Sequence, residues 1–285
     1  MKKLILIFIL INALNCSTSK SDDSKKSLLA AYTLLKSSST TASCTTTIGT
    51  GVADWVKNSF TCVTVAVSGT NYVFTSTSVP NYNSYYFGSS SSSYESSLYA
   101  TTNSGNPNLI SAQSVSLTIP VNTTSAVAAS TSYGTIGLAT NGISLYNDQA
   151  APGDSLATEY TTFDTAQGHP TNTGSYHYHV EPPKISISNT NLVGIMQDGY
   201  LVFGKYHNAS DTSSTNNTTG FTLGGTTSST KCTSTPNDLP STWSQLSNYR
   251  STTGHTSSNS YHYHVNYGSG VNAIIISGKY IGTKI

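Results

Sequence analysis

Hydrophobic and polar residues alternate in short runs along most of this chain. The alternation is clearest at 62–67, 72–74 and 115–119, and a period of two predicts strands with one buried face. Similar short runs predict further strands at 143–146, 176–180, 184–188, 192–196, 200–203, 261–265 and 272–277. Only 28–35 suggests a helix, and a short one. The pattern predicts a mostly β protein, built as an irregular β-sandwich or β-barrel.

The first sixteen residues have the pattern of an export signal. Lys2 and Lys3 precede an apolar run at 4–14 that is too short for a permanent membrane span. The run ends at Cys16 in the sequence Ala-Leu-Asn-Cys, which resembles the lipobox of bacterial lipoproteins, whose cysteine is acylated, and is similar to the looser signals of spirochaete lipoproteins. We therefore expect an extracytoplasmic protein, anchored by lipid to the outer membrane at the cell surface or the periplasmic face. An ordinary secretory signal is the alternative.

After this signal (1–16), composition divides the chain into three parts. Residues 17–35 are a small, polar and charged tether followed by the short helix. Residues 36–125 form a Ser/Thr-rich β region without histidine, and 126–285 form a second β domain that contains every histidine. We expect a structural role for the first β region. Binding of a glycan or protein partner is the alternative there, through exposed Tyr82, Tyr85, Tyr86 and Phe87.

Charge and cysteine content exclude several classes of protein. Only 9% of residues are charged and the net charge is +1, so no basic surface is predicted that would bind nucleic acid. With Cys16 lipidated, a disulfide between Cys44 and Cys62 would close a short loop across two strands and leave Cys232 without an assigned partner. The absence of a CxxC arrangement argues against a thiolate metal site.

Six of the seven histidines lie in two copies of one unit. Each copy begins with a Gly-His pair, passes through a polar loop, and ends in Ser-Tyr-His-Tyr-His-Val. The first copy contains His169, His177 and His179, and the second contains His255, His262 and His264. So close a repetition of an infrequent residue indicates a shared chemical role.

The spacing within each copy is suited to binding a metal ion. In a strand, His177 and His179 lie on one face and Tyr176 and Tyr178 on the other, so two imidazoles can converge while His169 approaches from the preceding loop. Imidazoles without thiolates favour a transition metal such as Zn²⁺ or Cu²⁺. Three protein ligands would leave a position open, whereas four from two adjacent strands would close the site. The alternative is a buried polar network of Tyr and His without metal.

Several ordered motifs resemble the YHYH domain family. The matching segments are 141–146, 163–164, 168–170, 174–179, 198–204 and the second Tyr-His-Tyr-His at 261–264. The resemblance covers about 126–285. It implies a fold and the location of a site, but it implies no particular reaction.

Asp198, in an Asp-Gly pair, is the best candidate for a carboxylate beside these histidines. It is a candidate metal ligand, a partner that orients an imidazole, or a catalytic base; a turn-forming role is the alternative. The leading hypothesis is a lipid-anchored protein that binds a transition metal through His177, His179, His262 and His264, with His169, His255 and Asp198 nearby. The alternatives are a metal-dependent hydrolase, and a surface adhesin or glycan-binding module with purely structural Tyr/His clusters. The sequence leaves open whether the protein is an enzyme.

Overall fold

A computed structural model describes most of the chain from Cys44 onward. The described residues are 44–98, 106–122, 130–152, 154–185, 192–204, 263–265, 270–275, 280 and 282–285. The predicted signal, Cys16, the tether and the short helix lie outside them, as do Cys232, His255 and His262. Within the described residues, no helix is long and apolar enough to cross a membrane.

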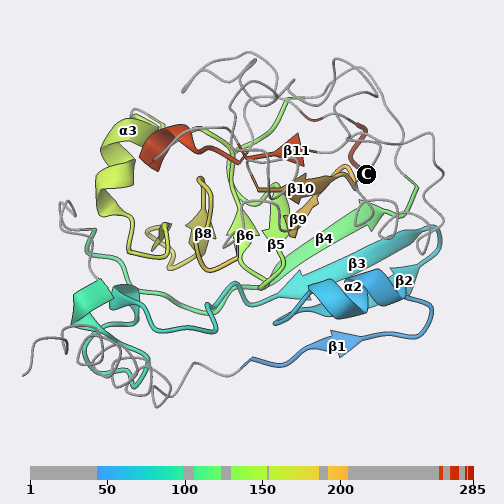
Figure 1. Cartoon of the computed structure of the whole chain (residues 1–285), viewed down its shortest axis with the longest axis horizontal. Coiled ribbons are helices and arrows are strands. Elements are labelled where there is room, and N and C mark those ends of the chain that lie inside the picture. Colours follow the sequence, from blue (N-terminus) through green and yellow to red (C-terminus); the bar gives the residue numbers. More distant parts are fainter. Residues whose placement is uncertain are drawn as a thin grey trace, which may run out of the picture. The chain divides into compact units, whose positions relative to one another are not determined.

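The first β region forms a four-stranded sheet in the order β1-β2-β3-β4 (Figure 1). Its strands are β1 (Thr47–Ile48), β2 (Thr64–Ser68), β3 (Asn71–Ser76) and β4 (Val115–Pro120). β1 pairs with β2 in parallel, and the other pairs are antiparallel. Buried and half-buried residues alternate along β3, as the period of two predicted. The short helix α2 (Asp54–Ser59) contributes Trp55 and Val56 to the same core.

The second sheet is mixed and has seven strands in the order β11-β10-β9-β5-β6-β8-β7. The strands are β5 (Gly137–Ala139), β6 (Ser144–Leu145), β7 (Gly168–Pro170), β8 (Tyr176–Tyr178), β9 (Leu192–Met196), β10 (Leu201–Phe203) and β11 (Tyr263–His264). Short helices accompany the sheets: η1 (Tyr85–Phe87), η2 (Ser96–Leu98), α3 (Leu156–Glu159), η3 (Tyr160–Thr162) and η7 (Gly270–Asn272).

The two sheets share one hydrophobic core. Phe74 and Ile119 of the first sheet pack in one buried cluster with Leu138, Ile195 and Phe203 of the second. This arrangement confirms the mostly β class and is that of a β-sandwich. Among the described residues the seven-stranded sheet does not close into a barrel. The predicted boundary near residue 125 falls in 123–129, outside the described residues.

Three local expectations were wrong. Residues 183–185 form a turn rather than the start of a strand, because Pro182 and Pro183 lack backbone N–H groups and the Ile185 N–H closes the turn on the Pro182 carbonyl. Residues 168–170, expected as a loop, form β7 at the edge of the sheet. Tyr82 and Tyr86 are buried in the core rather than exposed, which removes two of the four aromatic side chains expected to offer a glycan-binding surface.

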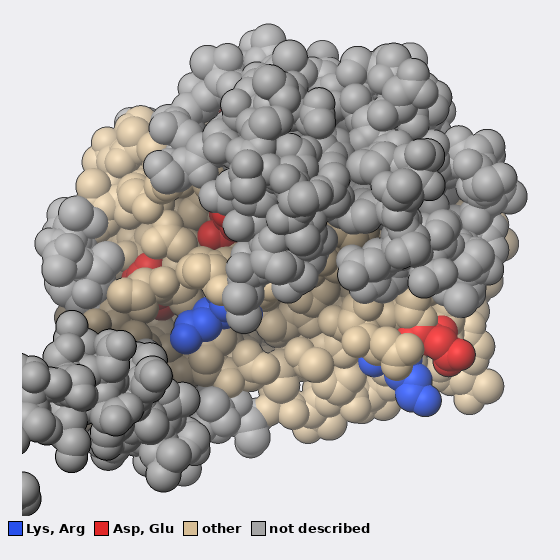
Figure 2. Space-filling model, in the orientation of Figure 1, with Lys and Arg blue, Asp and Glu red and all other residues tan. Residues whose placement is uncertain are grey.

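Two further sequence features have structural counterparts. Cys44 and Cys62 are joined by a disulfide, with their Cα atoms 5.0 Å apart. The face of the molecule in Figure 2 shows few charged side chains on the described surface, and those are scattered.

Candidate metal centre

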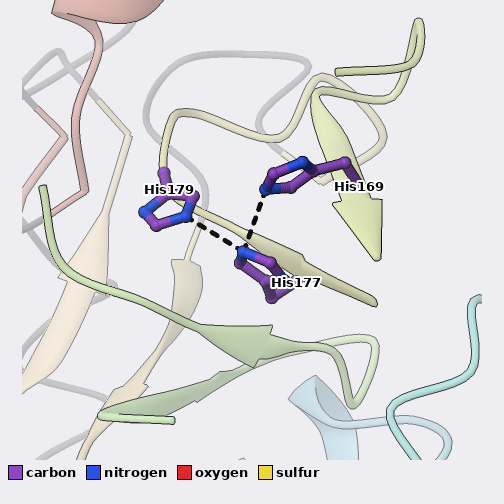
Figure 3. A group of neighbouring side chains, drawn as sticks. All are labelled: His169, His177 and His179. Carbon is purple, nitrogen blue, oxygen red and sulfur yellow. Dashed lines mark hydrogen bonds between the residues drawn. The ribbon is translucent and has the colours of Figure 1, made fainter. Parts of the chain in front are cut away.

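The hairpin of β7 and β8 brings three histidines to one face of the sheet. His169 in β7 lies directly opposite His177 in β8, and His179 follows two residues later on the same face. The turn between the strands needs Gly174, whose φ is +81° and at which a Cβ would lie 2.2 Å from Ser111 Oγ. All three imidazoles are buried, at 1–2% exposure. Figure 3 shows the three rings pointing toward one another.

The three Nε2 atoms converge. His177 Nε2 lies 3.1 Å from His169 Nε2 and 3.0 Å from His179 Nε2, and ligand atoms from the three residues all lie within 4.8 Å of one another. The Nδ1 atoms point outward, to partners around the site. Such a convergent set of nitrogens is the arrangement that a single metal ion requires.

Those outer partners determine where each ring carries its proton. His177 Nδ1 lies 2.9 Å from the Ser175 carbonyl oxygen, and His179 Nδ1 lies 2.5 Å from the Asn147 carbonyl oxygen. A carbonyl oxygen can only accept, so both Nδ1 atoms are protonated and donate. Their Nε2 atoms therefore present lone pairs to the site.

His169 has the same tautomer, which follows from two hydrogen bonds of Thr162. Its Nδ1 lies 2.8 Å from the Thr162 hydroxyl oxygen. That hydroxyl donates its one proton to the Glu159 carbonyl oxygen at 2.7 Å, so it must accept from His169 Nδ1. All three histidines thus carry their proton on the outer nitrogen, which is how metal-bound histidines are usually held.

The inner face of the cluster is consequently a set of lone pairs without a proton between them. Burial lowers the pKa of all three histidines, to about 4 for His179, and the neighbouring imidazoles lower the pKa of His169 and His177 further. The rings are therefore neutral at pH 7. Neither of the contacts dashed in Figure 3 can be an ordinary hydrogen bond between neutral rings of this tautomer. A metal ion coordinated by these nitrogens would make the arrangement favourable.

Glu159 is the carboxylate beside this cluster, and no sequence motif pointed to it. Its Oε1 lies 3.6 Å from His169 Nε2 and its Oε2 lies 3.7 Å from His179 Nε2. Burial, and secondarily the charge of Asp154, raise the pKa of Glu159 to about 7. A single Glu at the end of a short helix, ten residues before His169, has no sequence signal that would single it out.

A cavity of about 490 Å³ reaches the cluster. Glu159, Thr162 and His169 form part of its wall. The remaining lining includes polar side chains: Asn106, Asn108, Asp154, Thr158, Thr171 and Asn172. Two larger cavities, of about 650 and 520 Å³, are lined by none of the three histidines. The cavity beside Glu159 is thus a route by which an ion or small molecule could reach these residues.

Residues 115–252 match the family described as YHYH protein. This chain carries a YHYH domain. The match begins in β4, includes the first Tyr-His-Tyr-His and Asp198, and ends before the second Tyr-His-Tyr-His at 261–264. No curated protein and no solved structure matches the chain.

The tyrosines of the YHYH domain's first motif face away from the histidines and hold the fold. The Tyr176 hydroxyl donates to both carboxylate oxygens of Asp164, at 2.9 and 2.8 Å. Asp164 also accepts from the Ser84 hydroxyl and from the Ala166 and Gly168 N–H groups, so it caps the loop that leads into β7. Within the motif, the histidines therefore form the candidate site and the tyrosines anchor β8.

The second motif of the YHYH domain belongs to a different part of the sheet. Four strands (β10, β9, β5 and β6) lie between β11 and β8, and at roughly 4.8 Å per strand the two are not neighbours. The Tyr263 hydroxyl donates to Asp198 at 2.6 Å, as Tyr176 does to Asp164. For His264 only the backbone pairing with Phe203 is described, and His255 and His262 lie outside the described residues. A single site shared by both copies stays a prediction, whereas the first copy assembles three histidines by itself.

Asp198 has the contacts of a turn-forming residue. It lies between β9 and β10, before Gly199 with a φ of +82°. Besides Tyr263, it accepts hydrogen bonds from the Tyr200 and Gly282 N–H groups. The described hydrogen bonds of Asp198 therefore hold the turn between β9 and β10 to β11 and to the C-terminal segment, which fits the turn-forming alternative considered from the sequence.

Proposed function

We propose that this protein binds one transition-metal ion, Zn²⁺ or Cu²⁺, through the Nε2 atoms of His169, His177 and His179. The observation that carries the proposal is the shared tautomer of the three rings. Each outer nitrogen donates to an oxygen of the protein, so three bare lone pairs meet in one buried place. Without a cation, three buried nitrogen acceptors lack a hydrogen-bond donor, which costs free energy of folding.

The distances are close to those that such an ion needs. With Zn–N bonds of roughly 2.0–2.1 Å, two tetrahedral ligands stand about 3.3 Å apart. The Nε2 separations of 3.0 and 3.1 Å are a few tenths of an ångström shorter. A small outward movement of the rings would therefore admit the ion. Neutral imidazole suits Zn²⁺ and Cu²⁺ better than Ca²⁺ or Mg²⁺, which prefer oxygen ligands.

The test is metal analysis of protein purified without a nickel column. We expect about one equivalent of bound Zn or Cu, and a melting temperature that falls by roughly 10 °C when a strong chelator removes it, because a ligand at about 1,000 times its Kd stabilises by about 4 kcal/mol. Metal-free protein whose melting temperature does not change on addition of Zn²⁺ or Cu²⁺ would contradict the proposal.

We further propose that the protein acts outside the cytoplasm, anchored to the outer membrane by lipid on Cys16. The support is the basic and apolar run that ends at Cys16, together with the Cys44–Cys62 disulfide, which is typical of oxidising compartments. Cys16→Ser should move the protein from the membrane fraction to the soluble fraction and abolish labelling with radioactive palmitate. Unchanged fractionation and labelling of this variant would exclude Cys16 as the anchor.

A further inference from the structure

We propose that Glu159 is the fourth protein ligand of this centre, so that the ion would be held by three imidazoles and one carboxylate at the end of the 490 Å³ cavity. The inference rests on the proposed function, because it names a further ligand of the same site. The family resemblance and the repeated histidine unit did not point to this residue.

The first argument is the position of the carboxylate. Its two oxygens straddle the cluster, with Oε1 3.6 Å from His169 Nε2 and Oε2 3.7 Å from His179 Nε2. These separations are close to the roughly 3.3 Å expected between two ligand atoms of a tetrahedral zinc ion. They are too long for hydrogen bonds. The carboxylate thus lies beside the cluster, with each oxygen near a different ring and bonded to neither, so a small movement of the side chain would bring one oxygen to the ion.

The second argument is the lack of a donor for Oε2. This oxygen is buried and has no hydrogen-bond partner, and the ring nitrogens nearest to the carboxylate carry lone pairs rather than protons. A buried carboxylate oxygen without a donor is costly. An ion between Glu159 and the imidazoles would satisfy the carboxylate and the three rings together.

The third argument is a hydrogen-bond chain that links Glu159 to His169. The Thr162 hydroxyl donates to the Glu159 carbonyl oxygen and accepts from His169 Nδ1. These two hydrogen bonds therefore hold the backbone of Glu159 close to the ring of His169, although Glu159 ends α3 and His169 lies in β7. Ser155 caps the start of α3 through its hydroxyl, which accepts from the Thr158 N–H group. An ordered helical turn thus positions the carboxylate beside the cluster.

A carboxylate ligand would also suit the charge of the site. A divalent ion held by three neutral imidazoles keeps a charge of +2 in a buried place, whereas one carboxylate reduces it to +1 and lowers the cost of burial. The mixed nitrogen and oxygen set favours divalent ions such as Zn²⁺ and Cu²⁺ over Cu⁺, which prefers softer ligands. At 21% side-chain exposure, Glu159 lines the cavity together with His169.

The test compares Glu159→Gln with Asp54→Asn, a control in which an exposed carboxylate of α2, outside this cavity, becomes an amide. Full-length proteins are stripped of metal and titrated with Zn²⁺ against a chromophoric chelator, and with Co²⁺ while the visible spectrum is recorded. We expect Glu159→Gln to weaken Zn²⁺ binding at least tenfold and to shift the Co²⁺ d–d bands, because a ligand atom has changed. Asp54→Asn should stay within twofold of wild type, with the same spectrum.

The outcomes separate this inference from the function on which it rests. If Glu159→Gln binds Zn²⁺ as tightly as wild type with an unchanged Co²⁺ spectrum, Glu159 is not a ligand and the three-histidine site stands alone. Weakened binding with an unchanged Co²⁺ spectrum would also overturn the inference, since it would show an effect of charge without coordination. If wild-type protein binds neither ion, both proposals fail.

Discussion

Replacing His177 by Ala is expected to remove the bound metal and to lower the affinity for Zn²⁺ more than about 100-fold. Its Nε2 is the central atom of the cluster, 3.1 and 3.0 Å from the two others. Its ring is held by the Ser175 carbonyl oxygen and is stacked on Tyr146, with centroids 3.9 Å apart. This loss of affinity is larger than the one expected for replacing a residue that only orients a ligand, because here a ligand itself is removed.

The measurement is metal content and Zn²⁺ affinity of the purified variant, with far-ultraviolet circular dichroism to show that the fold persists. His207→Ala is the matched control, because it removes the one histidine that lies outside both repeated units. We expect this control to keep about one equivalent of metal. If folded His177→Ala protein also keeps about one equivalent of metal, the ion is bound elsewhere. That result would contradict a metal site formed by His169, His177 and His179.

The second large effect is a change of stability with pH that depends on Asp198. Burial raises the pKa of Asp198 to about 6, although its hydrogen bonds from Tyr263, Gly282 and Tyr200 act in the opposite direction. In the unfolded chain an Asp titrates near 3.9. The folded state therefore binds the proton more tightly than the unfolded state, and the contribution of Asp198 to stability is complete below about pH 4 and lost as the pH rises through about 6.

Asp198→Asn isolates this contribution, because the amide does not titrate in this range. The difference in free energy of unfolding, wild type minus Asp198→Asn, should fall by about 2 kcal/mol between pH 4 and pH 7, because the unfolded Asp is already about half ionised at pH 4 and the folded one is mostly ionised at pH 7. Urea unfolding at several pH values measures it. Asp54→Asn, at an exposed position of α2, should show no comparable change. A difference that is constant with pH, or that grows with pH, would contradict the burial effect assigned to Asp198.

Much of the site was predictable because strand geometry is local. The alternation of Tyr and His in 176–179 places the two imidazoles on one face whatever the rest of the fold does. His169 could be associated with them because the same pairing recurs in the second copy. The opposite face was only partly predictable. Alternation places Tyr176 there, but its partner Asp164 comes from a loop twelve residues earlier.

Whether the two motifs lie side by side could not be predicted from these local rules. Strand order depends on which hydrophobic faces meet in three dimensions, and here β10, β9, β5 and β6 separate β8 from β11. Each motif forms a buried Tyr–Asp hydrogen bond, but through different positions: Tyr176, the first tyrosine of its motif, with Asp164, and Tyr263, the second tyrosine of its motif, with Asp198. Among the described residues, the repeated sequence therefore does not give equivalent contacts.

By itself the sequence determined the β class, the disulfide candidate and the three histidines of the first copy, because each of these depends on spacing along the chain. Only the tertiary structure decided that Glu159 lies beside them and that each ring donates outward from Nδ1. Those features depend on the Thr162 hydroxyl and on the Ser175 and Asn147 carbonyl oxygens. Asn147 and Glu159 reach the site from separate segments that pack together only in the folded protein. The proposed metal site therefore consists of a local motif completed by non-local hydrogen bonds.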